Sequence, residues 1–327
     1  MPAVRPKGRY TSAMEILRGP TGLTPVKGTS VVAIGNFDGV HLGHQALLRA
    51  TLAAVAGGGG VPTVLTFEPH PREVLPPAVA GVPVPARLQR FREKVEVLAQ
   101  CGVQRLVVAR FNDHLRQLAA EDFIRCMLVE RLHTRHVVVG SGFRFGHRGL
   151  GSAVTLEREG IAGGFTTQTV PLVETAGETV SSTAVREALD AGDLARATRL
   201  LGRPYAVSGR VERGKQLGRT LGYPTLNLRL QRRRVPLAGI LAVRVTGGGL
   251  QRWPAVASLG TRPTVDVDGE VLLEVHLFDW QGDLYGARVT VEFVAWQRAE
   301  QRFDSLPALV VQMNADAREA RQWLAQA

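Results

Sequence analysis

The sequence predicts two domains of different classes: an N-terminal α/β domain built on a parallel sheet, then a C-terminal antiparallel β-barrel with a terminal helix. Between residues 30 and 200, short apolar runs alternate with helical patterns, which is typical of β-α-β units. From Tyr205 to about Val294 the residues alternate with period two, and turn residues recur. The 327 residues are enough for both domains, and we place them at 14–200 and 201–327.

Buried strands and the helices between them account for the first domain. Strand-like runs rich in β-branched residues lie at 30–35, 61–67, 103–111, 135–143 and 165–172. Helical patterns lie at about 44–56, 86–102 and 119–133. Because helices join the strands, the strands are expected to run parallel with both faces of the sheet covered. Ligands of such sheets bind outside the carboxyl ends of the strands.

The second domain follows two short helices, at 181–192 and 193–202. Its alternating segments predict a small barrel of about six strands. "GILAVRVTGGGLQRWPAVASLG" at 239–260 and "LLEVHLFDWQGDLYGARVTVEFV" at 272–294 are each expected to form a hairpin. A helix over 305–327 is expected to end the chain.

Composition excludes several classes of protein. Hydrophobic residues make up 45% of the chain, which favours a packed core over disorder. No apolar run reaches the ~18 residues of a membrane span. The basic start lacks the apolar segment of a secretory signal, and an organelle transit peptide stays open as an alternative. Cys101 and Cys126 have no C-x-x-C spacing, so we expect two buried, reduced thiols and a cytoplasmic protein.

The net charge of +11 is compatible with nucleic acid, with polyanionic small substrates, or with a basic surface alone. The basic residues are scattered, and the dense run Arg232 to Arg234 lacks interleaved aromatics and precedes Pro236, so we expect it to be a solvated loop. We therefore expect small-molecule partners and neither nucleic acid nor membrane. An RNA- or DNA-binding protein remains the non-enzymatic alternative, and it predicts a steep salt dependence of binding.

The stretch "GNFDGVHLGH" at 35–44 follows the first strand and opens the first helix. A single histidine is most often a satisfied surface or core residue, but here His41 and His44 form H-x-G-H at a strand-to-helix turn. Phosphate binds well at helix N-termini, where unpaired N–H groups and the helix dipole point at an anion. Imidazoles at this place can donate to phosphoryl oxygens and stabilise charge that builds up during transfer.

Residues 31–48 resemble the H-x-G-H nucleotidyltransferases, and "GNFDGVHLGHQALL" is similar to the bifunctional riboflavin kinase/FMN adenylyltransferase family. Three further motifs resemble that family in order and spacing: "TFEPHP" at 66–71, "VVVGSGFRFGHRGLG" at 137–151 and "VSSTAVREAL" at 180–189. With the barrel motifs, the resemblance spans roughly residues 14–327. It implies a Rossmann-like domain that adenylylates FMN with ATP, giving FAD and pyrophosphate.

The resemblance implies a role for each matching residue. His41 and His44 would contact the ATP phosphates and stabilise the transition state, and Arg186 would neutralise the departing pyrophosphate. The ATP-binding residues of this domain would be Gly35, Asn36, Phe37, Asp38, Gly39, Ser181, Ser182 and Thr183. The flavin-binding residues would be His70, Pro71 and Phe143. Read without the family, "SSTAVRE" predicts a capping box and "EPHP" a rigid surface turn.

One departure from the family pattern concerns Gly142, which stands where Asp or Asn is usual. A side chain implied in flavin contact is therefore missing, so a working kinase with a weak adenylyltransferase is an alternative. A second alternative is another H-x-G-H adenylyltransferase, acting on pantetheine phosphate or nicotinamide mononucleotide. That alternative leaves the C-terminal half of the chain unexplained.

"GRVERGKQLGR", from Gly209, approaches the G-x-x-x-x-G-K-[ST] loop of P-loop enzymes. Gln216 replaces the Ser/Thr, and the glycines and Pro224 that follow disfavour a helix. The longer "GRVERGKQLGRTLGYPTLNL" instead resembles the riboflavin kinase signature. That resemblance implies an ATP-binding flap containing Gly209, Gly214, Lys215, Gly218 and Arg219, and Mg²⁺ ligands at Thr225 and Asn227. In isolation, "GYPTLN" predicts only a turn leading into a strand.

The segment "LLEVHLFDWQGDLYG" places Glu274 in an apolar strand, where a carboxylate is costly unless it has a partner or a job. The segment resembles a kinase motif in which this glutamate is the general base. "SLGTRPT" and "WQRAEQRF" resemble further family motifs, which imply that Arg298 and Glu300 flank the flavin; otherwise the two would form a surface ion pair. The whole chain would thus phosphorylate riboflavin with ATP to FMN and then form FAD, with Mg²⁺.

Overall fold

The structure of the protein is a computed structural model. It describes residues 14–19, 25–75, 84–214, 222–230, 232, 234–261 and 271–326. These residues form two compact units. The first comprises Met1–Pro85 with Val95–Val173, and the second comprises Ala86–Lys94 with Glu174–Ala327, in each case as far as the residues are described. Each unit is considered by itself.

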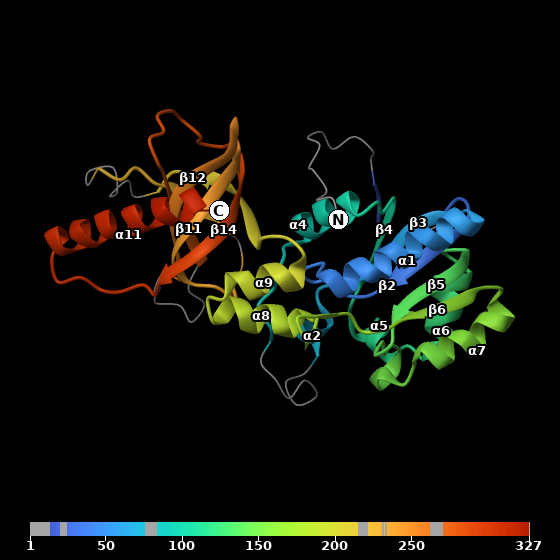
Figure 1. The fold of residues 1–327 in the computed structure, drawn as a ribbon. Helices are drawn as coiled ribbons and strands as arrows, with labels where there is room; N and C mark the ends of the chain where they lie inside the picture. The colour runs from blue at the N-terminus through green and yellow to red at the C-terminus, as the bar shows by residue number, and fades with distance from the viewer. Residues whose placement is uncertain are drawn as a thin grey trace. The chain divides into compact units, whose positions relative to one another are not determined.

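The first unit contains a six-stranded, entirely parallel sheet in the order β1-β4-β3-β2-β5-β6 (Figure 1). Its strands are β1 (Glu15–Arg18), β2 (Ser30–Ile34), β3 (Val61–Glu68), β4 (Arg105–Arg110), β5 (Thr134–Gly140) and β6 (Thr166–Val170). All five residues of β2 are buried. Because β2 lies in the middle of the sheet with both faces covered, its sequence is a continuous apolar run rather than an alternating one.

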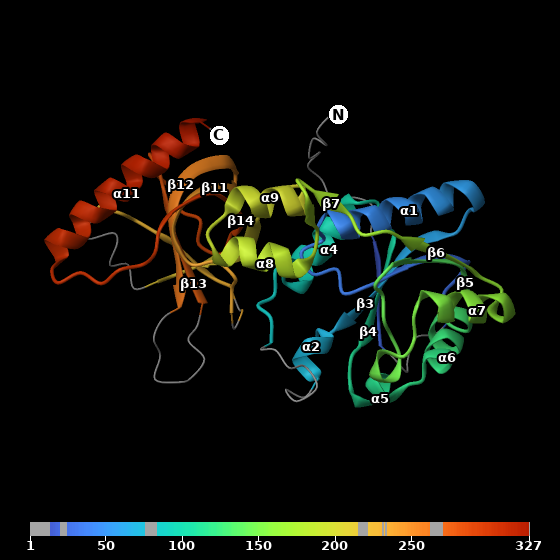
Figure 2. The ribbon, with the colours of Figure 1, turned by 60° about the horizontal axis from the view of Figure 1, so that its bottom comes forward.

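Helices cover both faces of this sheet, as the sequence predicted (Figure 2). Val32 and Ile34 belong to the core cluster that includes Phe123, Leu128 and Leu156, so they face the side covered by α6 and α7. Residues alternate across a strand, so Val31 and Ala33 face the other side of the sheet, where α1 lies. The helical segments of the unit are α1 (Leu42–Gly58), α2 (Pro71–Val74), most of α4 (Phe91–Gln100), α5 (Asp113–Gln117), α6 (Ala120–Phe123), a π-helical segment (Ile124–Val129), a 3-10 turn (His147–Gly149) and α7 (Ala153–Gly163).

Several details of this unit differ from the sequence predictions. The helix expected from 86 begins only at Phe91, and the one expected at 119–133 is α6 followed by the π-helical segment. The edge strand β1 was not predicted because it is short and mostly exposed, with Ile16 41% exposed, so it lacks a buried apolar run. Cys101 and Cys126 are half-buried thiols rather than fully buried ones.

The second unit contains a closed six-stranded antiparallel barrel in the order β10-β13-β12-β11-β14-β9, which confirms the predicted fold class. Its strands are β9 (Ala206–Glu212), β10 (Leu226–Arg229), β11 (Gly239–Gly247), β12 (Leu250–Thr261), β13 (Val271–Leu277) and β14 (Arg288–Arg298). Along β13, buried Val271, Leu273, Val275 and Leu277 alternate with half-buried residues. One face of the strand therefore fills the barrel and the other lies outside it.

One of the two expected hairpins is present and the other is not. β11 pairs with β12, whereas β13 pairs with β12 and β10, and β14 pairs with β11 and β9. The connection after β13 is instead bound to β9, because the Gly286 N–H donates to the Val211 carbonyl and the Val211 N–H to that of Ala287. The connection thus leads β14 to the other side of the barrel.

Among the described residues of this unit, the barrel is accompanied by α8 (Ser182–Asp190), α9 (Leu194–Leu201) and the C-terminal α11 (Leu306–Gln326). α11 packs on the barrel through a small core of alanines, Phe278 and Leu324. α9 packs on β14, so residues 174–200 group with the barrel. The predicted boundary at residue 200, which divides the two activities, stays a prediction. None of the helices in the described parts of the chain is long and apolar enough to cross a membrane.

Candidate functional site

The loop between β2 and α1 has a strained backbone. Phe37 and Val40 have φ values of 50° and 40°, and Gly39 lies between them at 86°. The left-handed region is unfavourable for a β-branched residue such as valine, and strain of this kind costs on the order of 1–3 kcal/mol per residue. Both side chains are fully buried, so their packing holds the loop in this course. Strain that packing maintains is most often found at functional sites.

His41 and His44 lie against each other at the start of α1. His41 is the N-cap residue, and its Nδ1 accepts a long hydrogen bond of 3.4 Å from the His44 N–H. The two rings are stacked, with centroids 3.8 Å apart and planes inclined by 22°. Because Nδ1 of His41 is the acceptor, a neutral ring carries its proton on Nε2. The predicted pair is thus assembled at the positive end of a helix.

Phe37 packs against His44, and the other residues of the loop are buried or half-buried. The Phe37 ring lies 4.9 Å from that of His44 and is fully buried, so it supports His44 from beneath. A Cβ on Gly35 would come within 3.3 Å of the Phe37 ring, which favours glycine there. The Asn36 carbonyl accepts from the Thr66 hydroxyl at 3.1 Å and ties the loop to β3. Asp38 is also buried.

The predicted flavin residues of this unit lie in two segments. His70 caps α2 through its Nδ1, which accepts from the Arg72 N–H at 3.2 Å, and Glu73 completes a capping box. The "EPHP" turn is therefore rigid. Phe143 stacks on Phe145 at 5.5 Å and packs against the core. Gly142 beside it is exposed, and apart from its two chain neighbours no described residue has a heavy atom within 4 Å of the position that a Cβ would take.

Ser181, Ser182, Thr183 and Arg186 lie at the start of α8, in the second unit. Ser181 caps the helix by accepting from the Ala184 N–H at 3.1 Å. The expected capping box with glutamate does not form, because alanine occupies the third helical position. The Arg186 guanidinium donates to the carbonyls of Ala86, at 2.7 Å, and Ser182, at 3.2 Å, so it is fixed beside the first turn.

On the outside of the barrel, the register aligns four polar side chains in one row. Asn227 of β10 pairs with Glu274 of β13 and with Glu212 of β9, and Glu274 pairs in turn with Ser258 of β12. Glu274 is half-buried on this outer face and does not lie on the apolar face of β13. The free energy needed to desolvate its carboxylate is therefore smaller than the sequence suggested. Cross-strand partners are close enough to act on one ligand.

Asn227 is the best candidate of this row for binding a cation. Its side chain is buried, and its Nδ2 donates weakly to the Thr225 carbonyl at 3.4 Å. Its buried Oδ1 has no hydrogen-bond partner among the described residues, which is uncommon for an amide oxygen. Gly214 approaches it closely, since a Cβ there would overlap the amide. The predicted Lys215, Gly218 and Arg219 lie outside the described residues.

Comparison with known families assigns both halves of the chain. Residues 24–184 match the family model of FAD synthetase, and residues 201–324 match that of riboflavin kinase. The curated bifunctional riboflavin kinase/FMN adenylyltransferase of Pseudomonas fluorescens is 47% identical over 309 residues, 94% of this chain and 97% of the relative. This chain belongs to the bifunctional riboflavin kinase/FMN adenylyltransferase family.

Another member of the family and a solved structure also match this chain over most of its length. The bifunctional riboflavin kinase/FMN adenylyltransferase of Escherichia coli K12 is 42% identical over 313 residues, 95% of this chain and 98% of that protein. A crystal structure described as a macrolide-efflux protein from Streptococcus pneumoniae has 31% identity and a TM-score of 0.77, and covers 92% of this chain and 99% of its own. The fold of this chain is therefore similar to that of a solved structure over most of both chains.

Arg298 and Glu300 do not pair with each other, contrary to the simple expectation of a surface ion pair. Arg298 binds Asp316 of α11 with both sides of its guanidinium, at 2.8 and 2.6 Å. Glu300 instead accepts a hydrogen bond from the Ser258 hydroxyl at 2.7 Å. A Cβ on Gly260 would overlap the Glu300 carboxylate, so this carboxylate lies over β12. Through Ser258, Glu300 is thus connected to the row of polar side chains that contains Asn227 and Glu274.

The prediction of a solvated loop at Arg232 is wrong. Its side chain is 3% exposed and forms an ion pair with Glu93, and it donates to the carbonyls of Arg87 and Leu88, each at 3.3 Å. Glu93 also accepts from the Ser208 N–H at 2.7 Å. A charge run in the sequence cannot show that a carboxylate more than a hundred positions away neutralises one of its members.

Ser258 and His276 lie beside Glu274 on the outside of the barrel, and the sequence analysis did not single them out, although both lie in the motifs quoted there. The period-two alternation could have identified His276, because it puts Glu274 and His276 on one face of β13.

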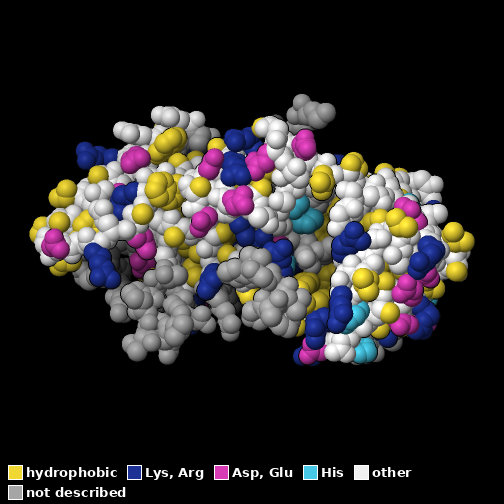
Figure 3. Space-filling model, turned by 90° about the horizontal axis from the view of Figure 1, so that it is seen from below, with side chains coloured by type: hydrophobic (Ala, Val, Ile, Leu, Met, Phe, Trp, Pro, Cys, Tyr) yellow, Lys and Arg dark blue, Asp and Glu magenta, His cyan; other side chains and the backbone are white. Residues whose placement is uncertain are grey.

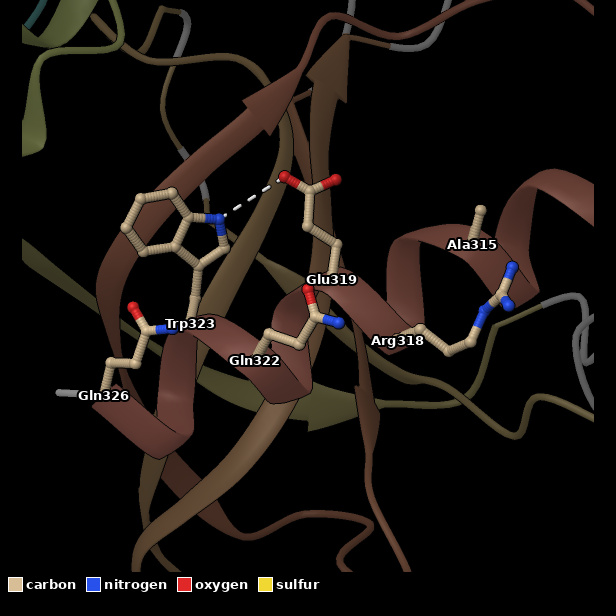
Figure 4. Close-up of a pocket in the computed structure, with 6 residues that line it drawn as sticks. All are labelled: Ala315, Arg318, Glu319, Gln322, Trp323 and Gln326. Atoms are coloured by element: carbon tan, nitrogen blue, oxygen red, sulfur yellow. Dashed lines mark hydrogen bonds between the residues drawn. The ribbon is translucent and has the colours of Figure 1, made fainter.

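A separate hollow of about 580 Å³ lies on the outer side of α11, lined by Ala315, Arg318, Glu319, Gln322, Trp323 and Gln326 (Figure 4). None of the predicted site residues lines it. On the face of the first unit seen in Figure 3, basic and acidic side chains are interspersed.

Proposed function

We propose that residues 14–200 adenylylate FMN with ATP and that residues 201–327 make this FMN from riboflavin and ATP. One observation carries the proposal: each family match contains its own set of residues suited to phosphate chemistry. The stacked His41 and His44 lie at a helix N-terminus in one match, and the Asn227–Glu274 pair lies on the barrel in the other. ATP, riboflavin and FMN are the substrates that membership of this family implies.

In the adenylylation step, an oxygen of the FMN phosphate attacks the α-phosphorus of ATP and the bond to pyrophosphate breaks. His41, through its Nε2–H, and His44 donate to the phosphoryl oxygens, where negative charge increases in the transition state. Gly35, Asn36, Asp38 and Gly39 shape the loop around this position. At α8, the serines and Thr183 offer N–H groups and hydroxyls to the β- and γ-phosphates, and Arg186 neutralises the pyrophosphate. We assign the flavin to His70, Pro71 and Phe143.

In the kinase step, the 5′-hydroxyl of riboflavin attacks the γ-phosphorus and ADP leaves. Glu274 accepts the hydroxyl proton, and its half-buried position restricts where the carboxylate can point. Gly209 and Gly214, with Lys215, Gly218 and Arg219, bind the ATP phosphates. In this proposal Arg298 and Glu300 flank the flavin. Arg298 is held in place by its hydrogen bonds to Asp316 of α11, and Glu300 by the hydrogen bond that it accepts from Ser258.

A magnesium ion fits the end of β10. The Oδ1 of Asn227, which has no hydrogen-bond partner among the described residues, and the Thr225 hydroxyl are the hard oxygen ligands that Mg²⁺ prefers. Water and phosphate oxygens would supply the other ligands of a six-coordinate ion. When bound, the ion would neutralise charge on the transferred phosphate. Thr225 and Asn227 would hold it, and Glu274 remains the proton acceptor. We also propose that the enzyme acts in the cytoplasm, in keeping with its two unbridged thiols.

The proposal is tested by incubating the protein with riboflavin, ATP and Mg²⁺ and separating riboflavin, FMN and FAD over time. FMN appearing before FAD supports both assignments. FMN accumulating without FAD supports the kinase and the alternative, motivated by Gly142, of a weak adenylyltransferase. Glu274→Gln should strongly lower FMN formation and spare FAD formation from added FMN, and His44→Ala should do the reverse. Loss of both activities from either folded variant would refute the division of labour.

A further inference from the structure

His276 lies two residues beyond Glu274 on the outer face of β13, and the reaction as proposed above does not use it. Its ring packs against Tyr223, with centroids 4.7 Å apart, and meets Phe278 edge-on at 5.9 Å. β10 runs antiparallel beside it, with Leu226 opposite Val275. Continuing this register by one residue places Thr225, one of the proposed metal ligands, opposite His276.

His276 is bound to the backbone immediately before that ligand. Its Nδ1 lies 2.9 Å from the carbonyl oxygen of Pro224. A carbonyl oxygen can only accept, so Nδ1 carries a hydrogen and donates it. Burial lowers the pKa of His276, and the hydrogen bond to Pro224 opposes this effect. In either protonation state of the ring, Nδ1 carries a hydrogen and donates it to the Pro224 carbonyl.

The two peptide groups on either side of Thr225 are therefore each held by a hydrogen bond from a side chain. His276 binds the carbonyl of Pro224, and the Asn227 amide nitrogen binds the carbonyl of Thr225 at 3.4 Å. Because the Asn227 nitrogen is used in this way, its oxygen Oδ1 is the atom left for a ligand. The Tyr223 hydroxyl bonds to Asn314 of α11, which fixes the chain one residue further back.

We propose that His276 is a positioning residue of the barrel site: its Nδ1–H fixes the Pro224–Thr225 peptide so that Thr225 and Asn227 present their oxygens to one divalent cation. Outer partners of this kind orient metal ligands, and their loss typically weakens metal binding by about 10–100-fold. The inference rests on the proposed function, because it assumes that Thr225 and Asn227 hold the cation.

The test uses Mn²⁺ as a paramagnetic probe, titrated into the full-length protein with ADP and followed by electron paramagnetic resonance. The Mn²⁺ binding that is lost in Asn227→Ala is assigned to the barrel site. We expect His276→Leu to weaken that binding by about tenfold or more. His276→Asn should keep most of the Mn²⁺ affinity of the barrel site, because the side-chain N–H of asparagine takes the place of Nδ1–H. In riboflavin phosphorylation, His276→Leu should raise the apparent KM for Mg²⁺ while kcat at saturating Mg²⁺ is largely retained.

Controls separate this inference from the proposed function. His136→Leu, in β5 of the first unit, should leave Mn²⁺ binding by the barrel unchanged. If Asn227→Ala does not weaken Mn²⁺ binding, the metal assignment itself is wrong. If Asn227→Ala weakens it but His276→Leu does not, or His276→Asn is as weak as His276→Leu, the inference alone is overturned. Should His276→Leu fail to fold, His276→Gln replaces it, because its longer side chain moves the N–H away from Pro224.

Discussion

Asn227 on β10 lies between two carboxylates, opposite Glu274 of β13 on one side and Glu212 of β9 on the other. The register alone does not distinguish the two glutamates as proton acceptors, but their surroundings do. Glu274 is half-buried in the middle of a strand, whereas Glu212 is exposed at the end of one. A general base has to be held within hydrogen-bond reach of its proton, which favours the more confined Glu274.

We therefore expect Glu274→Gln to lower kcat for riboflavin phosphorylation by roughly 10²–10⁴-fold, the usual contribution of a positioned base. Glu212→Gln, the matched change across Asn227, should leave this rate within a few-fold of the wild type. Both rates are measured by chromatography of FMN formed at saturating ATP. Conversion of added FMN to FAD is the internal control for folding. A large loss in Glu212→Gln with little loss in Glu274→Gln would assign the base to the other strand.

His41 caps α1, and we propose that it also donates to phosphate; the two roles can be separated. His41→Ala removes both and should cost about 1 kcal/mol of stability, as loss of an N-cap does. His41→Asn keeps a good cap and should unfold in urea at the wild-type midpoint or above. Both variants should form FAD about 10²–10³-fold more slowly, as when a transition-state donor is removed. An Asn variant with normal FAD formation would reduce His41 to a capping residue.

Gly142 is exposed, and the space where a side chain would begin is open. Gly142→Asn should therefore fold normally and restore a polar group where the family usually has one. A hydrogen bond contributes about 0.5–1.5 kcal/mol, so we expect KM for FMN in FAD formation to fall about two- to tenfold. Gly142→Ala is the matched control, because it adds the Cβ without the polar atoms. If both variants behave like the wild type, the missing side chain does not limit adenylylation.

The sequence predicted those elements whose signal is local. β2 and β3 were found from their β-branched runs, and the period-two alternation of the second half predicted the closed barrel. The second hairpin was wrong because strand order depends on pairing partners that lie far apart in the chain. β14 joins β11 and β9, and nothing in the ten-residue connection from Phe278 to Ala287 specifies that choice.

The candidate sites show the same division. H-x-G-H and the capped start of α8 were predicted because each is built from neighbouring residues. The partners of charged side chains were not predicted, because the partners of Arg232 and Arg298 come from other elements of the unit. A motif thus locates a residue near a site, but only packing shows whether its charge is directed to a ligand or to another part of the protein.

Arg298 is the residue for which this distinction matters most. Its guanidinium lies on both oxygens of Asp316, whose side chain is 7% exposed, and Gln312 also donates to that carboxylate at 2.9 Å. Removing one partner of a buried pair leaves an uncompensated charge. We expect Arg298→Ala to lower the stability of the protein by about 3 kcal/mol, measured as the urea dependence of unfolding.

The double variant Arg298→Met/Asp316→Leu should recover much of that stability, because an apolar pair of similar volume carries no buried charge. Glu300→Gln is the matched control for stability: Glu300 is exposed, so its replacement should change unfolding by less than about 0.5 kcal/mol. KM for riboflavin is then measured on the stable double variant. A normal KM there would mean that Arg298 serves to hold α11 against β14. A raised KM, with stability recovered, would mean that the guanidinium also contacts the flavin.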